Sequence, residues 1–89
     1  MEITAWGLQV PIVQAPMAGV QAGGLAGAVS AAGGLGSLPC ALLSVDGMRK
    51  ELELVRARTD RPLNVNFFCH VPPPPDAARE AAWREVLAP

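Results

Sequence analysis

Residues 11–19, with the sequence Pro-Ile-Val-Gln-Ala-Pro-Met-Ala-Gly, join a short apolar stretch to a stiff turn of small residues. Ile12 and Val13 favour extended structure, whereas Pro16 fixes its own φ, removes a backbone donor and biases Ala15 toward extended geometry. Because the side chains that follow are small, the backbone carbonyl and amide groups of this turn stay open to close approach by another molecule. The segment is either a strand end that holds a flat ligand or an ordinary connection between a strand and a helix.

A second candidate site is the alternating segment 63–68, Leu-Asn-Val-Asn-Phe-Phe. Side chains alternate along a strand, so Asn64 and Asn66 point to the same side, and Asn66 lies nearer the carboxyl end. Parallel α/β folds place their ligands at that end. A carboxamide offers a donor and an acceptor together, which suits the edge of a heterocycle that presents both C=O and N–H. The alternative is an asparagine that satisfies the backbone of a neighbouring loop.

The other residues that could do chemistry carry weaker signals. His70 could be a ligand or a base, but it follows the predicted strand directly before a run of prolines. Cys40 and Cys69 lack the C-x-x-C spacing of a zinc site, so we expect reduced, buried thiols rather than a disulfide, no metal site and a cytoplasmic protein. Trp6 and Trp83 are interpreted as packing residues.

Residues 33–37, Gly-Gly-Leu-Gly-Ser, have the composition of a nucleotide-binding loop. A dinucleotide fingerprint follows a strand and opens a helix, whereas this cluster follows a predicted helix and opens a predicted strand. We therefore interpret the cluster as a turn that ends the helix. Gly36 could in addition thin the strand so that a ring can lie over it.

Hydrophobic periodicity predicts three repeats of a strand followed by a helix. Strands are predicted near residues 11–13, 35–38 and 63–68, and helices over residues 23–32, from the N-cap Ser44 to about residue 58, and from Asp76 onward. Strands that alternate with helices imply a parallel sheet with right-handed crossovers. The fold class predicted from these elements is α/β.

Each predicted helix has an apolar face that we expect to be buried. The first helix is expected to bury Leu25, Ala28, Val29 and Ala32, the second Val45, Met48, Leu52 and Val55, and the third Ala82, Trp83, Val86 and Leu87. In the second helix Asp46 lies in the first turn, while Arg56 and Arg58 lie near the carboxyl end. These charges complement the helix dipole.

The first half of the chain contains a long run without charged residues. The 89 residues carry a net charge of −1, and residues 3–45 contain no Asp, Glu, Lys or Arg. An uncharged run this long is typical of material enclosed on several sides, which predicts that partner surface is missing. Gly, Pro, Gln and Ser interrupt every apolar run before the ~20 residues of a membrane span. The basic residues alternate with acids, so we expect no binding to nucleic acid or membrane.

Three motifs carry a resemblance to a known family. They are residues 11–17 (Pro-Ile-Val-Gln-Ala-Pro-Met), residues 31–37 (Ala-Ala-Gly-Gly-Leu-Gly-Ser) and residues 59–70 (Thr-Asp-Arg-Pro-Leu-Asn-Val-Asn-Phe-Phe-Cys-His). In this order and at this spacing they resemble the amino-terminal part of nitronate monooxygenases, formerly called 2-nitropropane dioxygenases. The resemblance covers nearly the whole chain. The family fold is a TIM (β/α)8 barrel that binds FMN at the carboxyl ends of its strands, and its members are several times longer than this chain.

The resemblance implies that residues 1–89 are the amino-terminal part of a single FMN-binding TIM-barrel domain and supply its first three strand–helix units. It implies that the backbone of Ala15, Pro16 and Met17 lies against the isoalloxazine ring and that Asn66 hydrogen-bonds the polar edge of the ring. In such barrels the flavin phosphate is usually held by loops after the seventh and eighth strands. Those loops and the family's catalytic histidine are expected beyond Pro89, so we expect no catalytic residue within residues 1–89.

The activity that the resemblance implies belongs to the complete protein. It is the FMN-dependent oxidation of an alkyl nitronate by O2 to a carbonyl compound and nitrite, and we expect the fragment itself to be inactive. One alternative is an FMN-dependent enoyl-acyl-carrier-protein reductase of the same fold, whose relatives usually show two glycines where this chain has Ala15 and Pro16. The other is a non-enzymatic truncated product, the interpretation to prefer if the natural protein ends at Pro89.

Overall fold

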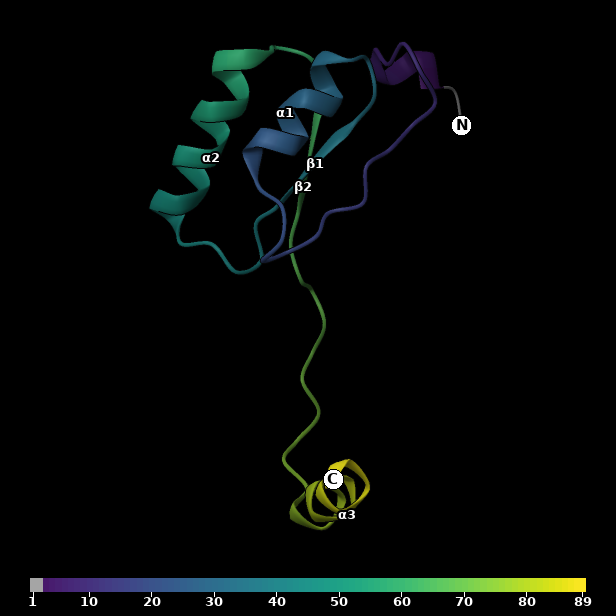
Figure 1. Cartoon of the computed structure of the whole chain (residues 1–89), viewed down its shortest axis with the longest axis vertical. Helices are drawn as coiled ribbons and strands as arrows, with labels where there is room; N and C mark the ends of the chain where they lie inside the picture. The colour runs from purple at the N-terminus through teal and green to yellow at the C-terminus, as the bar shows by residue number, and fades with distance from the viewer. Residues whose placement is uncertain (1–2) are drawn as a thin grey trace.

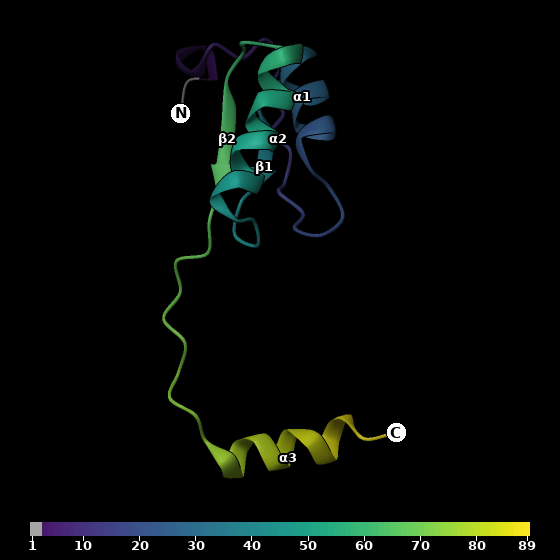
Figure 2. The same cartoon turned by 90° about the vertical axis from the view of Figure 1, so that its left-hand side faces the viewer.

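An α/β body and a separate carboxyl-terminal helix make up the chain in the computed structural model, which describes residues 3–89 (Figure 1). The elements in chain order are η1 (Ile3–Trp6), α1 (Gly23–Ala31), β1 (Gly36–Pro39), α2 (Val45–Arg58), β2 (Leu63–Asn66) and α3 (Ala77–Leu87). α1 covers β1, and α2 packs against α1 on the same face of the sheet (Figure 2). No helix among residues 3–89 is long and apolar enough to cross a membrane.

β1 and β2 form a parallel pair, as predicted. Gly36 lies opposite Leu63 and Pro39 opposite Asn66. α2 makes the crossover between the two strands, so this part of the chain is a β-α-β unit.

The predicted first strand is reduced to a single parallel bridge between Val13 and Leu35. Two hydrogen bonds of 2.9 Å make the bridge, from Leu35 N–H to the Ile12 carbonyl and from Gln14 N–H to the Leu35 carbonyl. The next rung of a parallel ladder would need an N–H group at position 16, and Pro16 has none. The expectation of three strands is therefore wrong for this segment, which stays beside β1 without becoming a strand.

α1 forms where it is predicted, but the predicted buried face is wrong. The buried residues are small, namely Gly23, Ala26, Gly27 and Ser30, whereas Leu25 and Ala32 are exposed. The reason is close packing on two sides. A Cβ atom on Gly36 of β1 would overlap the carbonyl oxygen of Ala26, and Gly23 and Gly27 lie against α2. Gly36 thus makes room for α1, and the expectation that it leaves space for a ligand ring is wrong.

The glycine cluster after α1 is a turn that ends the helix, as predicted. Gly33 adopts φ +100°, a conformation that side-chain-bearing residues rarely take. Its carbonyl accepts hydrogen bonds from Gln9 and Val10. The turn therefore connects the end of α1 to the amino-terminal segment.

Local signals define α2 well. The Ser44 hydroxyl oxygen accepts a hydrogen bond of 3.1 Å from the Gly47 N–H, which makes Ser44 the predicted N-cap. Val55 is buried against α1, while Met48 and Leu52 are half-buried and Val45 is exposed. The predicted apolar face is thus covered only at its carboxyl end.

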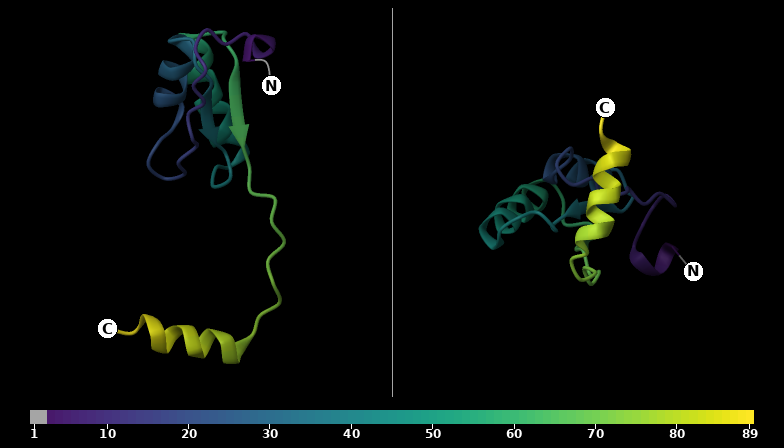
Figure 3. Two further views of the ribbon diagram at one scale, coloured as in Figure 1. Left: turned by 90° about the vertical axis from the view of Figure 1, so that its right-hand side faces the viewer. Right: turned by 90° about the horizontal axis from the view of Figure 1, so that it is seen from below.

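α3 begins beside the predicted start at Asp76, which the structure shows to be its N-cap, but it packs against no other element of residues 3–89. None of its residues is buried, and 59% of Trp83 is exposed. Residues 67–76 are extended and include four consecutive prolines, which favour a stiff polyproline conformation. This segment carries α3 away from the body (Figures 2 and 3). The expectation that α3 buries its apolar face in a third strand–helix unit is therefore wrong.

The hydrophobic core is small for the amount of apolar sequence. Its fully or nearly fully buried members are Leu8, Ala26, Leu38, Cys40 and Val55. Many large hydrophobic side chains of the uncharged run are exposed, including Trp6, Ile12, Val13, Met17, Val20 and Leu42. The expectation that both tryptophans pack inside is wrong among the described residues, and the exposed apolar surface agrees with the prediction that partner surface is missing.

Candidate functional site

The candidate site lies at the edge of the sheet where the parallel strands end. Both strand arrows in the left view of Figure 3 point to this edge, where the loop of residues 14–22 and the loop of residues 40–44 lie. A pocket of about 230 Å³ shows that the two loops meet. Its lining residues are Ala18, Gly19, Gln21 and Ala22 from the first loop and Pro39, Leu42 and Leu43 around the second.

The two asparagines of β2 make different contacts. The Asn64 side-chain amide donates a hydrogen bond of 3.1 Å to the Ser37 hydroxyl on β1. This contact places Asn64 on the sheet face opposite α1, because the neighbouring Gly36 faces α1. Asn66 shares that face by alternation and is half-buried, but its side chain makes no hydrogen bond within residues 3–89. Its carboxamide is free to bind another molecule.

The turn that contains Ala15, Pro16 and Met17 presents open backbone groups. Ala15 and Met17 are exposed and Pro16 is half-buried. The Met17 N–H donates to the Gln21 side-chain oxygen at 3.1 Å, so this donor is already used. The N–H groups of Ala15 and Ala18 have no acceptor among the described residues. They are the donors that this turn offers to a ligand.

The sequence reasoning missed two glutamines that tie this turn to β1. Gln14 accepts a hydrogen bond of 3.1 Å from the Ser37 N–H through its side-chain oxygen. Gln21 donates one of 2.9 Å to the Ser37 carbonyl through its side-chain nitrogen. The signal that could have found them is Pro16, because a proline at this rung leaves a strand carbonyl in need of another donor.

The two cysteines lie in different segments of the chain, and His70 directly follows Cys69. Cys40 starts the second loop, and its N–H donates to the Asn66 carbonyl at 2.9 Å. Burial raises the pKa of the Cys40 thiol above its ordinary value. Both cysteines are free thiols, as predicted. Cys69 is exposed, so the expectation that both thiols are buried is wrong for Cys69, which lies in the extended segment after β2. His70 lies in the extended segment, with its ring 5.9 Å from that of Phe68.

A flat heterocycle with both C=O and N–H groups fits this edge. The Asn66 carboxamide, unpartnered within residues 3–89, can pair with such an edge, and the open N–H groups of Ala15 and Ala18 can donate to a carbonyl or ring nitrogen. The donor set is therefore compatible with the isoalloxazine ring of a flavin. In the described part of the chain, no three His, Cys, Asp or Glu side chains gather in a group that could hold a metal ion.

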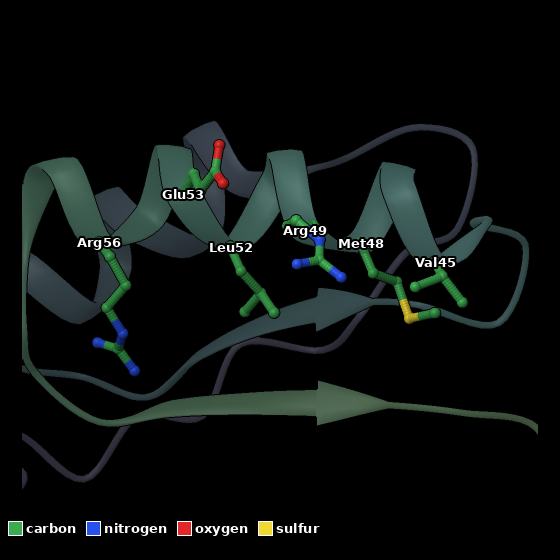
Figure 4. A pocket seen from close by; sticks show the side chains of 6 residues that line it. All are labelled: Val45, Met48, Arg49, Leu52, Glu53 and Arg56. Carbon is green, nitrogen blue, oxygen red and sulfur yellow. The ribbon is translucent and has the colours of Figure 1, made fainter.

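A larger hollow of about 450 Å³ lies along one side of α2 (Figure 4). Its lining residues are Val45, Met48, Arg49, Leu52, Glu53 and Arg56. Figure 4 shows Met48, Leu52 and Arg56 projecting from the same side of the helix. The hollow contains none of the candidate ligand-binding residues, so we assign it no part in the site.

Comparisons with known proteins agree on one family. The family model described as nitronate monooxygenase matches residues 2–89. Nitronate monooxygenases of Paraburkholderia phytofirmans and Pseudomonas aeruginosa are 53% and 51% identical to this chain over 83 residues, which is 93% of this chain and 23% and 24% of those proteins. The crystal structure of a nitroalkane oxidase from Streptomyces ansochromogenes is similar with a TM-score of 0.70 and 43% identity, covering 91% of this chain and 23% of that protein. The chain thus spans about a quarter of the length of these relatives. It belongs to the nitronate monooxygenase family.

Proposed function

We propose that this chain forms the flavin-facing amino-terminal part of an FMN-dependent nitronate monooxygenase with a single TIM-barrel domain. The reaction is the oxidation of an alkyl nitronate by O2 to a carbonyl compound and nitrite. FMN supplies the redox chemistry when it is bound. The observation that carries the proposal is the Asn66 carboxamide, which lies at the carboxyl edge of the parallel strands without a partner among residues 3–89. The names of the relatives support the substrate class.

The residues of this chain bind and orient the ring in this proposal. Asn66 pairs its donor and acceptor with the polar edge of the isoalloxazine, and the backbone of Ala15, Pro16 and Met17 lies against the ring. The N–H groups of Ala15 and Ala18 add two donors on the same side. Because the Met17 N–H is already bound by a side chain, Met17 contributes apolar contact rather than a hydrogen bond.

The rest of the machinery is proposed to come from the remaining strand–helix units of the barrel, which would follow Pro89 in the complete protein. TIM barrels usually hold a phosphate with the loops after the seventh and eighth strands. The group that handles the substrate proton is proposed to lie beyond Pro89 as well. Residues 1–89 by themselves are therefore proposed to be inactive.

A chimera tests the proposal. This fusion protein, called the chimera below, is the Pseudomonas aeruginosa nitronate monooxygenase in which residues 1–89 of this chain replace the matching segment. We expect the chimera to retain FMN after dialysis, measured by its visible absorbance, and to release nitrite from ethyl nitronate while consuming O2. A folded chimera that holds no flavin would contradict the proposal. A flavin-loaded chimera that reduces an enoyl thioester with NAD(P)H and leaves the nitronate unchanged would favour the reductase alternative.

A further inference from the structure

The parallel ladder between residues 12–14 and β1 stops one rung before it reaches Ser37. By the pattern of the existing rung, the next one would join Ser37 N–H to the Gln14 backbone carbonyl and the N–H of residue 16 to the Ser37 carbonyl. Pro16 has no N–H, so the second of these bonds cannot form. Ser37 is completely buried, and a buried peptide group without partners is costly.

Two glutamine side chains replace the missing rung. The Gln14 side-chain oxygen accepts from Ser37 N–H in place of the Gln14 backbone carbonyl, at 3.1 Å. The Gln21 side-chain nitrogen donates to the Ser37 carbonyl in place of the absent Pro16 N–H, at 2.9 Å. Both polar groups of the Ser37 backbone are therefore satisfied although the chain leaves the sheet at this point.

Gln21 also holds the turn itself. While its side-chain nitrogen binds the Ser37 carbonyl of β1, its side-chain oxygen accepts from the Met17 N–H at 3.1 Å. The Ser37 hydroxyl accepts from Asn64 of β2 at 3.1 Å. We call Gln14, Gln21, Ser37 and Asn64 together the Ser37 hub. Through it the turn is fixed relative to both strands.

We propose that Gln14 and Gln21 are positioning residues that set the place of the turn 15–18 over the end of the sheet and, through it, the orientation of the flavin ring. This inference rests on the proposed function. Gln21 carries more of the effect because it bridges the turn and the sheet, whereas Gln14 binds only the sheet and its own neighbour, the Ala15 carbonyl.

The directions of the hydrogen bonds give an asymmetric test with glutamate. Gln14→Glu keeps the oxygen that accepts from Ser37 N–H. Gln21→Glu keeps the acceptor for Met17 N–H but places a carboxylate oxygen against the Ser37 carbonyl, where a donor is needed. Gln9→Ala is the matched control, because Gln9 is exposed and its side chain belongs to no part of the Ser37 hub.

The variants are compared in the chimera. We expect Gln21→Glu to weaken FMN binding by about 3- to 100-fold, because the displaced turn loses one or two hydrogen bonds to the flavin ring. We also expect it to shift the visible absorption and circular dichroism of the remaining bound flavin and to speed hydrogen exchange at the Met17 amide in the apoprotein. Gln14→Glu keeps its acceptor for Ser37 N–H but loses the donor to the Ala15 carbonyl, so we expect it to have a smaller effect than Gln21→Glu on all three measurements. Gln9→Ala is expected to keep the wild-type affinity, flavin spectra and exchange rates.

Several outcomes would overturn the positioning role. They are equal behaviour of Gln14→Glu and Gln21→Glu, wild-type FMN affinity in Gln21→Glu, or a lowered melting temperature in Gln21→Glu with unchanged flavin spectra. If the unsubstituted chimera binds FMN and Gln21→Glu behaves like it, only the positioning role fails. If the unsubstituted chimera binds no FMN, the proposed function fails. Hydrogen exchange in the apoprotein then still shows whether the Ser37 hub forms, so the two failures are distinguishable.

Discussion

At the scale of single residues, the two asparagines of β2 differ in the hydrogen bonds that their side chains make. Asn64 is tied to Ser37, and removing its amide would leave a buried hydroxyl without its donor. Asn66 has no such tie within residues 3–89 and lies at the ligand-binding end of the strand. The same side chain type thus serves the fold at one position and is open to a ligand at the other.

Replacement of each asparagine by alanine in the chimera separates these roles. Asn66→Ala is expected to lower FMN affinity by about 3- to 100-fold, since one or two hydrogen bonds of about 0.5 to 1.5 kcal/mol each are lost, and to leave the melting temperature of the apoprotein unchanged. Asn64→Ala is expected to lower the melting temperature with little change in FMN affinity. FMN dissociation constants and melting temperatures of both variants measure this. Wild-type FMN binding by Asn66→Ala would contradict the assignment.

The Cys40 thiol gives a pH-dependent prediction. Because burial raises its pKa in the folded state, the unfolded state loses this proton first as pH rises. Its contribution to stability is therefore full at neutral pH and is lost as pH rises through the alkaline range. We expect the urea midpoint of the chimera to fall between about pH 8 and pH 10, and to fall less in Cys40→Ala. An equal fall in both proteins would contradict this origin.

At the scale of elements, local signals in the sequence correctly predict where helices start, whereas the packing of the helices on the sheet does not follow from them. Ser44 is correct as an N-cap and Asp76 as the place where the third helix starts, because both depend on contacts between residues three positions apart. The buried face of α1 is not predicted, since it is set by how closely β1 and α2 approach. The candidate turn and Asn66 follow from proline chemistry and strand alternation, whereas the Ser37 hub joins side chains 16 to 27 positions away from Ser37.

Gly36 and Gly24 form a matched pair that tests the close packing of α1 on β1. A Cβ on Gly36 would overlap the Ala26 carbonyl oxygen, whereas a Cβ on Gly24 meets nothing within 4 Å. In the chimera, Gly36→Ala is expected to lower the free energy of unfolding by about 1 to 3 kcal/mol or more through overpacking. Gly24→Ala is expected to raise it by about 0.5 to 1 kcal/mol, because alanine favours the helix. Urea unfolding measures both, and equal effects would contradict the packing.

At the scale of the whole molecule, the apolar surface exceeds what this chain can bury by itself. The hollow along α2 is open, 46% of Val65 on β2 is exposed, and α3 has no packing partner within residues 3–89. These surfaces belong to different elements and face different directions. In the proposed barrel they are covered by the strands and helices that the relatives have in addition to this segment.

The isolated 89-residue chain is accordingly expected to be molten or aggregated and to bind FMN weakly. Its exposed apolar surface predicts strong fluorescence of the dye ANS and a thermal transition without cooperativity. Because the phosphate-binding loops are proposed to lie beyond Pro89, the isolated chain is expected to bind FMN and riboflavin equally, whereas the chimera is expected to bind FMN the more tightly of the two. Equilibrium dialysis of both proteins with both flavins measures this difference. A monomeric chain with dispersed amide NMR signals, a cooperative transition and submicromolar affinity for FMN would show that residues 1–89 form a flavin-binding domain of their own.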